Sequence, residues 1–354
     1  MAYRFFAPPP ARAATGRAAQ VYQQMRDDFP GPAPTFHALS VAPDIMAAAW
    51  ALMRESLLAS DDGPASESGS RVDREVVAAV VSRANGCRFC TDAHVTLLHA
   101  LGEHELAETI ARGGSPPQPG RAELARWAAA SRHPRATGWA GRYDPRLTGT
   151  LLAFHFINRV VSALLAPDLL PAGLQRSSAV RAAGGRLLAR RLRAPVVPGR
   201  GLALLDDSGE RPPAWARRDP VGAAWVALRD AAARGGDLLG ELARHTVTAT
   251  VRWEDGGHPA DPVAWVGDLV RDLPAGERVG ARIALLAAFA PEAITAGDTG
   301  LWRLTHPSDA DLVRLVAYGA VTATEHVARA LDPAPALTHV HDADREEPSC
   351  AEPS

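Results

Sequence analysis

The chain has no lysine: all 38 of its basic residues are arginine. Because alanine, glycine and proline are abundant as well, we interpret this as a coding bias rather than as a sign of arginine-specific chemistry. An excess of one charge is also lacking, since the formal net charge is −2 over 354 residues. Proteins that bind nucleic acid usually carry a strong positive excess. We therefore expect no nucleic-acid partner.

Long uninterrupted apolar runs are missing too. Residues 1–20 lack the apolar core of a signal peptide. The most hydrophobic stretch, residues 147–174, is interrupted by polar and charged residues such as His155 and Arg159. This pattern predicts a buried helix rather than a membrane span. We expect a cytoplasmic protein without a membrane partner.

Cysteine is scarce, with three residues in the whole chain. Cys87 and Cys90 lie in "NGCRFCTDAH" (residues 85–94), and Cys350 lies close to the end. In the cytoplasm stable structural disulfides are rare, and a C-x-x-C pair is more often catalytic or metal-binding. The pair is therefore the first candidate for chemistry.

Runs of alternating β-branched residues are few. Apolar positions instead recur at helical spacing, as in "IMAAAWALMRESLLA" and "LVRLVAYGAVTATEHVARAL". Residues 245–253, "HTVTATVRW", are β-prone by propensity, but their surroundings favour a helix. With 47% hydrophobic residues to form a core, the sequence predicts an all-α fold, a helical bundle.

The length leaves room for two domains of moderate size. We expect a first helical domain over residues 1–175 with the C-x-x-C site, and a second over residues 220–331. Between them, residues 176–219 form an arginine-rich connector and loop. Its arginines could bind anions or nucleic acid, but the low net charge favours a solvated connector. The proline-rich and acidic tail, residues 332–354, is expected to be disordered.

A faint repeat relates the two halves. "RWAAASRHPRAT" (126–137) is echoed by "RIALLAAFAPEAIT" (282–295), and "REVV" aligns with "GELA". We predict a duplicated domain whose halves pack about a pseudo-twofold axis. At this offset Trp253 stands where the first half has Cys87, so the second copy has lost the dithiol. We expect Trp253 to fill the former pocket.

The residues around the dithiol predict two helices. A capping pattern at Ser70 begins the first, and the Asn-Gly step at 85–86 ends it. The second runs from Cys87 to Leu101. Both cysteines then lie in its first turn, where the unpaired N–H groups and the helix dipole favour a thiolate. We therefore expect a lowered pKa for Cys90.

Three reactive groups share one face of this second helix. Cys87, Cys90 and His94 fall within about 60° of arc. A nucleophilic cysteine needs a lowered pKa or a nearby base. A second cysteine three positions away can resolve a sulfenic acid into a disulfide, and a histidine can move protons near neutral pH. Glu75, on the preceding helix, is the candidate carboxylate to orient that histidine.

The spacing E-x11-C-x2-C-x3-H, within residues 70–105, resembles the alkyl hydroperoxidase D-like core of the carboxymuconolactone decarboxylase superfamily. The likeness extends more loosely over residues 30–165, and the second half looks like that of the long two-copy members. This resemblance implies an all-α fold and homo-oligomers with sites near subunit or repeat interfaces. We expect an enzyme that needs no cofactor.

The resemblance assigns roles to four residues. Cys90 would be the peroxidatic nucleophile and Cys87 the resolving thiol, while His94 and Glu75 would form the proton relay. The substrate would be a small organic hydroperoxide, and the reductant a dithiol protein, which in the family can be of the lipoyl type. Well-studied members carry a further histidine where this chain has Phe89. The relay would then be shorter or routed through water, and His155 is a candidate substitute.

Several alternatives stay open. A zinc site of Cys87, Cys90, His94 and His99 is one, but a regular helix turns His99 about 120° away from Cys87, so we expect no metal. The cysteines could also be small buried core residues. Other functional alternatives are a lactone-directed acid–base enzyme, a thiol–disulfide oxidoreductase and a non-catalytic assembly protein.

Overall fold

The computed structural model describes residues 3–29, 33–60, 69–136, 144–168, 174, 177–192, 194–207 and 209–331. These residues form fifteen α-helices, joined by short 3-10 and π turns, and no strand beyond an isolated bridge between Tyr3 and Leu165. The all-α prediction is confirmed. Cys350 and the tail that we expect to be disordered lie outside the described residues.

Eight helices belong to the first half of the chain: α1 (Gly16–Asp28), α2 (Pro34–Leu39), α3 (Pro43–Met53), α4 (Arg71–Ala84), α5 (Arg88–Ala100), α6 (His104–Ala111), α7 (Pro119–Ala130) and α8 (Pro145–Leu164). Several begin with proline at the first helical position, where its missing N–H costs nothing. The predicted cap of α4 is present, since the Ser70 side chain accepts a hydrogen bond from the backbone N–H of Asp73.

Seven helices follow: α9 (Ser178–Leu192), α10 (Pro220–Ala233), α11 (Glu241–Glu254), α12 (Pro262–Val270), α13 (Ala275–Phe289), α14 (Ala296–Arg303) and α15 (Asp309–Leu331). The β-prone segment 245–253 is helical, within α11, as its surroundings predict. Thr295 opens α14 with a full capping box.

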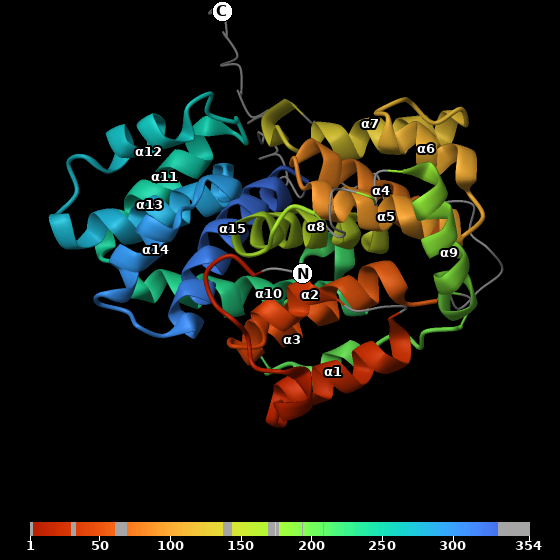
Figure 1. The fold of residues 1–354 in the computed structure, drawn as a ribbon, viewed down its shortest axis with the longest axis horizontal. Coiled ribbons are helices and arrows are strands. Elements are labelled where there is room, and N and C mark those ends of the chain that lie inside the picture. The colour runs from red at the N-terminus through yellow and green to blue at the C-terminus, as the bar shows by residue number, and fades with distance from the viewer. Residues whose placement is uncertain are drawn as a thin grey trace, which may run out of the picture.

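Helix α8 occupies the centre of the molecule (Figure 1). It packs against α3 and α4 of the first half and against α10 and α15 of the second. A Cβ at Gly149 would lie 2.3 Å from the Val221 side chain, so glycine lets α8 and α10 approach closely. By length and composition α8 could cross a membrane, but 94% of its most apolar window is buried inside the protein. The expectation of a buried helix here is confirmed.

The two halves present helices in a comparable order. In the first, α4 packs against α7 and α8; in the second, α11 packs against α13 and α15. Helices α3 and α10 also contact each other, as do α8 and α15. In Figure 1 the remaining helices of the halves spread to opposite sides of this central group, with α11–α14 on one side and α4–α7 on the other. The internal duplication is compatible with this packing and stays a prediction.

Trp253 does not fill a pocket. It lies in the last turn of α11 with 78% of its surface exposed. The buried positions of this helix include Val247 and Val251, one turn apart. Trp253 follows Val251 by two residues, about 200° round the helix, so it points away from the core. The expectation for Trp253 was wrong because aligning the two halves of the chain at a fixed offset does not indicate which face of a helix is buried.

The arginine-rich segment also differs from expectation. Helix α9 packs along α5 instead of forming a solvated connector. A Cβ at Gly185 would lie 2.9 Å from the backbone nitrogen of Ala100, so the two helices are in close contact there. The guanidinium of Arg181 is buried and binds both carboxylate oxygens of Glu108 at 2.8 Å. Small residues and one buried ion pair thus attach α9 to the first half.

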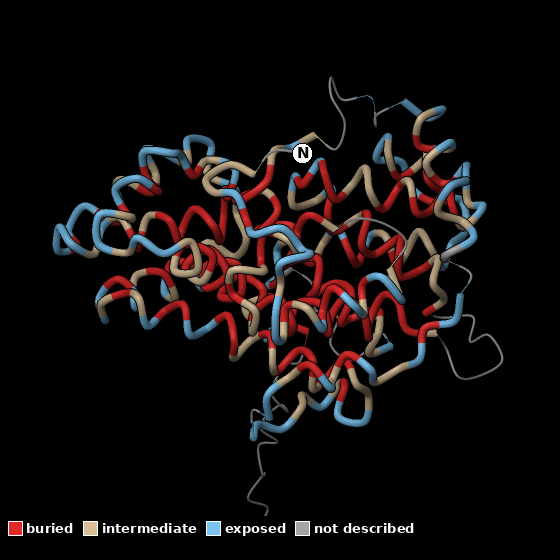
Figure 2. The backbone as a smooth tube through the Cα atoms, turned by 60° about the horizontal axis from the view of Figure 1, so that its bottom comes forward, coloured by how far each residue is buried: buried red, intermediate tan, exposed pale blue. Residues whose placement is uncertain are grey.

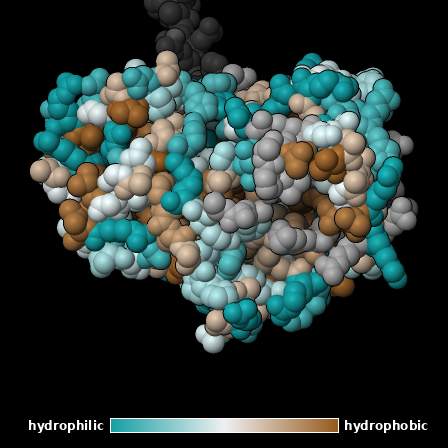
Figure 3. Space-filling model, in the orientation of Figure 1, coloured by the Kyte–Doolittle hydropathy of each residue, from teal (hydrophilic) through white to brown (hydrophobic). Residues whose placement is uncertain are grey.

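Buried backbone is concentrated where helices of both halves meet, and exposed residues lie along the outer turns (Figure 2). On the face drawn in Figure 3, hydrophobic residues form separate patches rather than one continuous surface. Large apolar side chains that are exposed include Leu187 on α9 and Leu304 after α14.

Candidate redox site at the start of helix α5

The dithiol sits at the junction of α4 and α5. Asn85 and Gly86 form the turn, and Gly86 adopts a φ of 71°, a left-handed conformation that favours glycine. Cys87 is the N-cap of α5, and its sulfur accepts a hydrogen bond from the backbone N–H of Cys90 at 3.4 Å. The predicted position of both cysteines at a helix start is confirmed.

Both thiols are free and buried, with 2% of Cys87 and 4% of Cys90 exposed. Their Sγ atoms lie 2.6 Å apart. Because a disulfide needs both sulfurs in contact and a short Cβ–Cβ separation, this pair can be oxidised with little movement of the backbone.

The pKa of Cys90 differs from the sequence-based expectation. Burial raises the pKa of the Cys90 thiol well above the usual cysteine range, and the contact with Cys87 raises it further. The backbone N–H at the helix start acts in the opposite direction but is outweighed. The prediction of a lowered pKa was wrong because it counted the helix terminus and not the loss of water. Cys90 therefore needs a base to become a thiolate.

Glu75 and His94 form a buried pair next to the dithiol. Nδ1 of His94 lies 2.7 Å from Oε2 of Glu75, and the carboxylate is fully buried. Since a carboxylate can only accept, Nδ1 carries the proton and Nε2 is the basic nitrogen. The ring also meets Phe154 edge-on, with centroids 4.3 Å apart. The predicted pairing of Glu75 with His94 is present.

Arg71 forms an ion pair with Glu75 that the sequence analysis did not predict. Its Nε and Nη2 donate to Oε1 of Glu75 at 3.0 and 2.8 Å. Burial would raise the pKa of Glu75, but Arg71 and His94 together outweigh burial and hold that pKa below its usual value. The spacing of Arg71 four residues before Glu75 on one helix was the signal that could have revealed the contact.

His94 is close to the thiols in sequence but not bonded to them. Within the described part of the chain, no hydrogen bond joins His94 to either sulfur. Phe89 is buried in the core beside the cysteines. A proton moving from Cys90 to His94 therefore needs a bridging water or a small side-chain movement.

His155 does not substitute for the missing histidine. Its Nε2 lies 2.8 Å from the Ser131 hydroxyl and its Nδ1 3.3 Å from the Asn85 amide, and neither nitrogen contacts a sulfur. Burial and the charge of Arg159 lower the pKa of His155 well below its usual value. It is a buried neutral imidazole that contacts Asn85 of the α4–α5 turn and Ser131.

The histidines of the alternative zinc site contact different partners. His94 is bonded to Glu75, whereas His99 contacts His104 at 2.8 Å and Glu108 at 2.9 Å. Among the described residues, no three histidine, cysteine, aspartate or glutamate side chains are gathered as a metal site would require.

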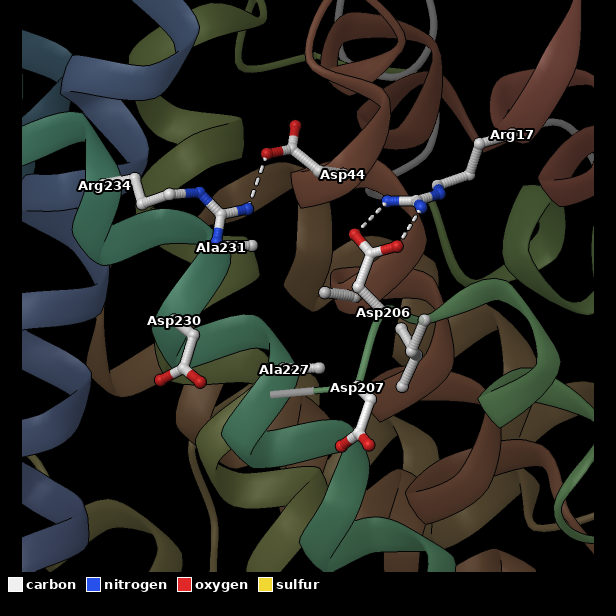
Figure 4. A pocket seen from close by; sticks show the side chains of 10 residues that line it. Arg17, Asp44, Asp206, Asp207, Ala227, Asp230, Ala231 and Arg234 are labelled. Carbon is white, nitrogen blue, oxygen red and sulfur yellow. Dashed lines mark hydrogen bonds and ion pairs between the residues drawn. The ribbon is translucent and has the colours of Figure 1, made fainter. Parts of the chain in front are cut away.

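A polar pocket lies elsewhere, between α1, α3, α10 and the segment after the turn Arg200–Leu204 (Figure 4). Its charged groups are largely paired: Arg17 binds Asp206 and Arg234 binds Asp44. Neither cysteine lines this pocket. It is distinct from the candidate redox site.

The model of the carboxymuconolactone decarboxylase family matches residues 45–131, the region from α3 to the end of α7 that contains the dithiol. The chain belongs to this family, within the alkyl hydroperoxidase D-like superfamily. It is 31% identical over 335 residues to a Mycobacterium tuberculosis protein named alkyl hydroperoxide reductase, an alignment that covers 90% of this chain and 92% of the relative. The likeness thus includes the second half. No solved structure matches the chain.

Proposed function

We propose that this protein is a thiol-dependent peroxidase that reduces organic hydroperoxides through Cys87 and Cys90. The observation that carries the proposal is the contact between two free, buried thiols at a helix start, one turn from the Glu75–His94 pair. The name of the mycobacterial relative supports the same reaction class.

The proposed reaction is a two-electron reduction of the hydroperoxide to the alcohol. His94 accepts the Cys90 proton at Nε2, and the thiolate attacks the terminal oxygen of ROOH. The O–O bond breaks, Cys90 becomes a sulfenic acid, and the alkoxide takes a proton to leave as ROH. The Cys87 sulfur then attacks the sulfenic sulfur, which forms the disulfide and releases water. An external dithiol reduces the disulfide by exchange and restores both thiols.

Glu75 has a positioning role in this scheme. Its carboxylate holds His94 with Nε2 free to accept a proton and stabilises the imidazolium that results. Because the pKa of Glu75 is held below its usual value, the carboxylate stays ionised throughout.

The partners follow from this chemistry. The reductant that we propose is a small dithiol protein, such as one bearing a lipoyl group, acting in the cytoplasm. We also propose a homo-oligomer, on the family resemblance.

Peroxide consumption by the cysteine variants tests the proposal. Reduced full-length protein with cumene hydroperoxide and dithiothreitol should turn over, and Cys90→Ser should abolish turnover. Reduced Cys87→Ser, freed of dithiothreitol, should consume one equivalent of hydroperoxide and then hold a sulfenic acid on Cys90 that dimedone traps. Cys350→Ser is the matched control and should keep full turnover. If both Cys87→Ser and Cys90→Ser retain full turnover, the assignment is wrong.

A second candidate is acid–base chemistry on a lactone, the reaction that the family name describes. The raised pKa of Cys90 favours it, because a neutral thiol is a poor nucleophile. Under this alternative, a Cys87→Ser/Cys90→Ser double variant would keep its activity on a carboxymuconolactone, and His94→Ala would lose it.

A further inference from the structure

An open pocket lies between α4, α6 and α7, helices that lie together on one side of the molecule (Figure 1). It encloses about 280 Å³. At roughly 30 Å³ for a group the size of a water molecule, this volume holds about nine non-hydrogen atoms. Neither cysteine lines the pocket, and neither Glu75 nor His94 does. It is therefore separate from the candidate redox site.

The floor of this pocket is apolar. Val80 of α4, Ile110 of α6 and Ala125 of α7 form it, and all three belong to or pack against a small apolar cluster between α4, α5 and α6. The other apolar lining positions carry small residues, which leave the space unfilled: Ala84, Gly113, Gly114, Ala122 and Ala129. Burying such an apolar surface under an apolar ligand is favourable, because water is released from both.

Two exposed arginines lie at the rim of the pocket, Arg83 at the end of α4 and Arg126 on α7. Arg83 donates to the backbone oxygen of Ala111 at 3.3 Å, and Arg126 donates to that of Ala122 at 3.4 Å. Within the ranges that the structure describes, no ion pair joins either guanidinium to a carboxylate. Since a guanidinium has five N–H groups, each arginine keeps donors for an anion.

Gly113 positions one of these two cations. The guanidinium of Arg83 lies directly against the backbone of Gly113, and a Cβ at that position would overlap it. The absence of a side chain at Gly113, together with the hydrogen bond to the Ala111 carbonyl, thus keeps the charge of Arg83 at the rim of the pocket.

We propose that this pocket binds an amphiphilic anion, an unbranched alkyl chain of about eight carbons that ends in an oxyanion head group. The chain covers the apolar floor, and the head group accepts hydrogen bonds from Arg83 and Arg126. Charge complementarity decides the sign of the ligand, because the pocket is lined by two arginines and by no acidic residue. The head group is a carboxylate or a phosphate, both of which a guanidinium binds through paired N–H groups.

This site goes beyond the proposed peroxidase reaction and does not depend on it. Binding of the anion is an equilibrium step in which neither thiol takes part, so it can be measured whether or not the protein consumes hydroperoxide.

Calorimetric titration of the reduced full-length protein with sodium octanoate tests the proposal, at fixed ionic strength and below the concentration at which octanoate forms micelles. We expect saturable binding with one octanoate per chain. Sodium acetate, which has the head group without the chain, should bind at least tenfold more weakly. 1-Octanol, which has the chain without the charge, should bind at least threefold more weakly. Octyl phosphate is titrated in parallel, and the tighter of the two anions identifies the head group.

Variants separate the roles of charge and apolar surface. Arg83→Gln and Arg126→Gln should each weaken octanoate binding at least threefold and leave 1-octanol binding unchanged. Ala129→Phe, which places a large side chain in the pocket from an exposed position, should weaken the binding of both ligands. Arg186→Gln, which removes an exposed arginine on α9, is the matched control and should keep the wild-type dissociation constants.

Three results would overturn the proposal. If neither octanoate nor octyl phosphate binds saturably, the pocket is not a site for amphiphilic anions. If all variants bind octanoate as the wild type does, the ligand lies elsewhere on the protein. If 1-octanol binds as tightly as octanoate, the two guanidinium groups take no part and the ligand is not an anion.

Discussion

At the scale of single residues, burial controls the chemistry of the site. Cys90 is a neutral thiol because water is excluded from it, and Glu75 is a stable carboxylate because Arg71 and His94 replace the lost water. Burial alone raises the pKa of both groups, but for Glu75 the neighbouring Arg71 and His94 reverse the shift. What decides the outcome is whether a cation lies beside the acid.

Cys90 should react with alkylating agents only at alkaline pH. In a Cys87→Ser/Cys350→Ser double variant, which keeps Cys90 as its one thiol, the rate of iodoacetamide modification should rise with a midpoint above about 8.5, the free cysteine value. Burial, the largest cause of the raised pKa, persists in this variant. A midpoint below the free value would show that the helix terminus or His94 outweighs burial.

Glu75→Gln should make the protein less stable at neutral pH, by about 1–3 kcal/mol, the cost of leaving a buried polar partner unsatisfied. The folded-state pKa of Glu75 is lowered. Its contribution is therefore complete above the unfolded-state pKa of about 4.3 and is lost as the pH falls through the folded-state value. Urea unfolding should show a wild-type advantage at pH 7 that shrinks at pH 4.

Glu105→Gln is the control for this series. Glu105 is an exposed residue in the first turn of α6, and its replacement should change the free energy of unfolding by less than about 0.5 kcal/mol. If Glu105→Gln lowered the free energy of unfolding as much as Glu75→Gln does, the net charge and not the buried Glu75–His94 pair would determine how stability depends on pH.

At the scale of elements, two glycines position the helix that carries the dithiol. Gly86 turns the chain between α4 and α5 with a φ of 71°, and Gly185 allows α9 to lie against the backbone of α5. Gly86 is needed for its backbone conformation, and Gly185 is needed because it has no side chain. Substitutions separate these two reasons.

Gly86→Ala should destabilise the protein by about 1 kcal/mol, because an L-residue is strained at positive φ. A Cβ there would meet nothing within 4 Å, so no steric clash contributes. Gly120→Ala is the matched control: its Cβ also meets nothing within 4 Å, and it lies at an ordinary φ in α7. It should be neutral or slightly stabilising in the same urea titration. An equal loss of stability in Gly86→Ala and Gly120→Ala would contradict the argument from backbone conformation.

Gly185→Ala should loosen α9 from α5. Its Cβ would lie 2.9 Å from the nitrogen of Ala100, whereas a Cβ at Gly184 would meet only the Thr96 side chain at 3.3 Å. Trypsin should therefore cleave after the exposed Arg186 and Arg190 faster in Gly185→Ala than in Gly184→Ala or the wild type. Identical cleavage rates would mean that α9 is held by its Arg181–Glu108 ion pair alone.

At the scale of the whole molecule, α8 and α15 form a core shared by both halves. Val221 of α10 packs against Gly149 of α8, and the guanidinium of Arg159 donates to a carbonyl of α13. Separation of the halves would expose these faces to water. Neither half is an independent unit in this packing.

A chain ending at residue 172 should therefore self-associate. It would expose the apolar faces of α3 and α8 that α10 and α15 cover. Light scattering after size-exclusion chromatography should show aggregates or a different oligomer from the full-length protein. A monodisperse, monomeric fragment would show that the second half is dispensable for the core.

The sequence by itself determined the local features. Helical periodicity gave the all-α class, the capping pattern at Ser70 gave the start of α4, and spacing alone placed the two cysteines at the start of α5. The pairing of Glu75 with His94 was expected from the residues on the two adjoining helices and from the family resemblance. These features depend on neighbours within a few turns of helix or on a motif, which one sequence contains.

The tertiary structure decided what depends on distant segments. The raised pKa of Cys90, the packing of α9 on α5 and the exposure of Trp253 each depend on which helix covers which face. The contact of Arg159 on α8 with the carbonyl of Ala288 on α13 likewise joins residues more than a hundred positions apart. Burial and electric field are sums over neighbours in space, so no local pattern in the chain encodes them.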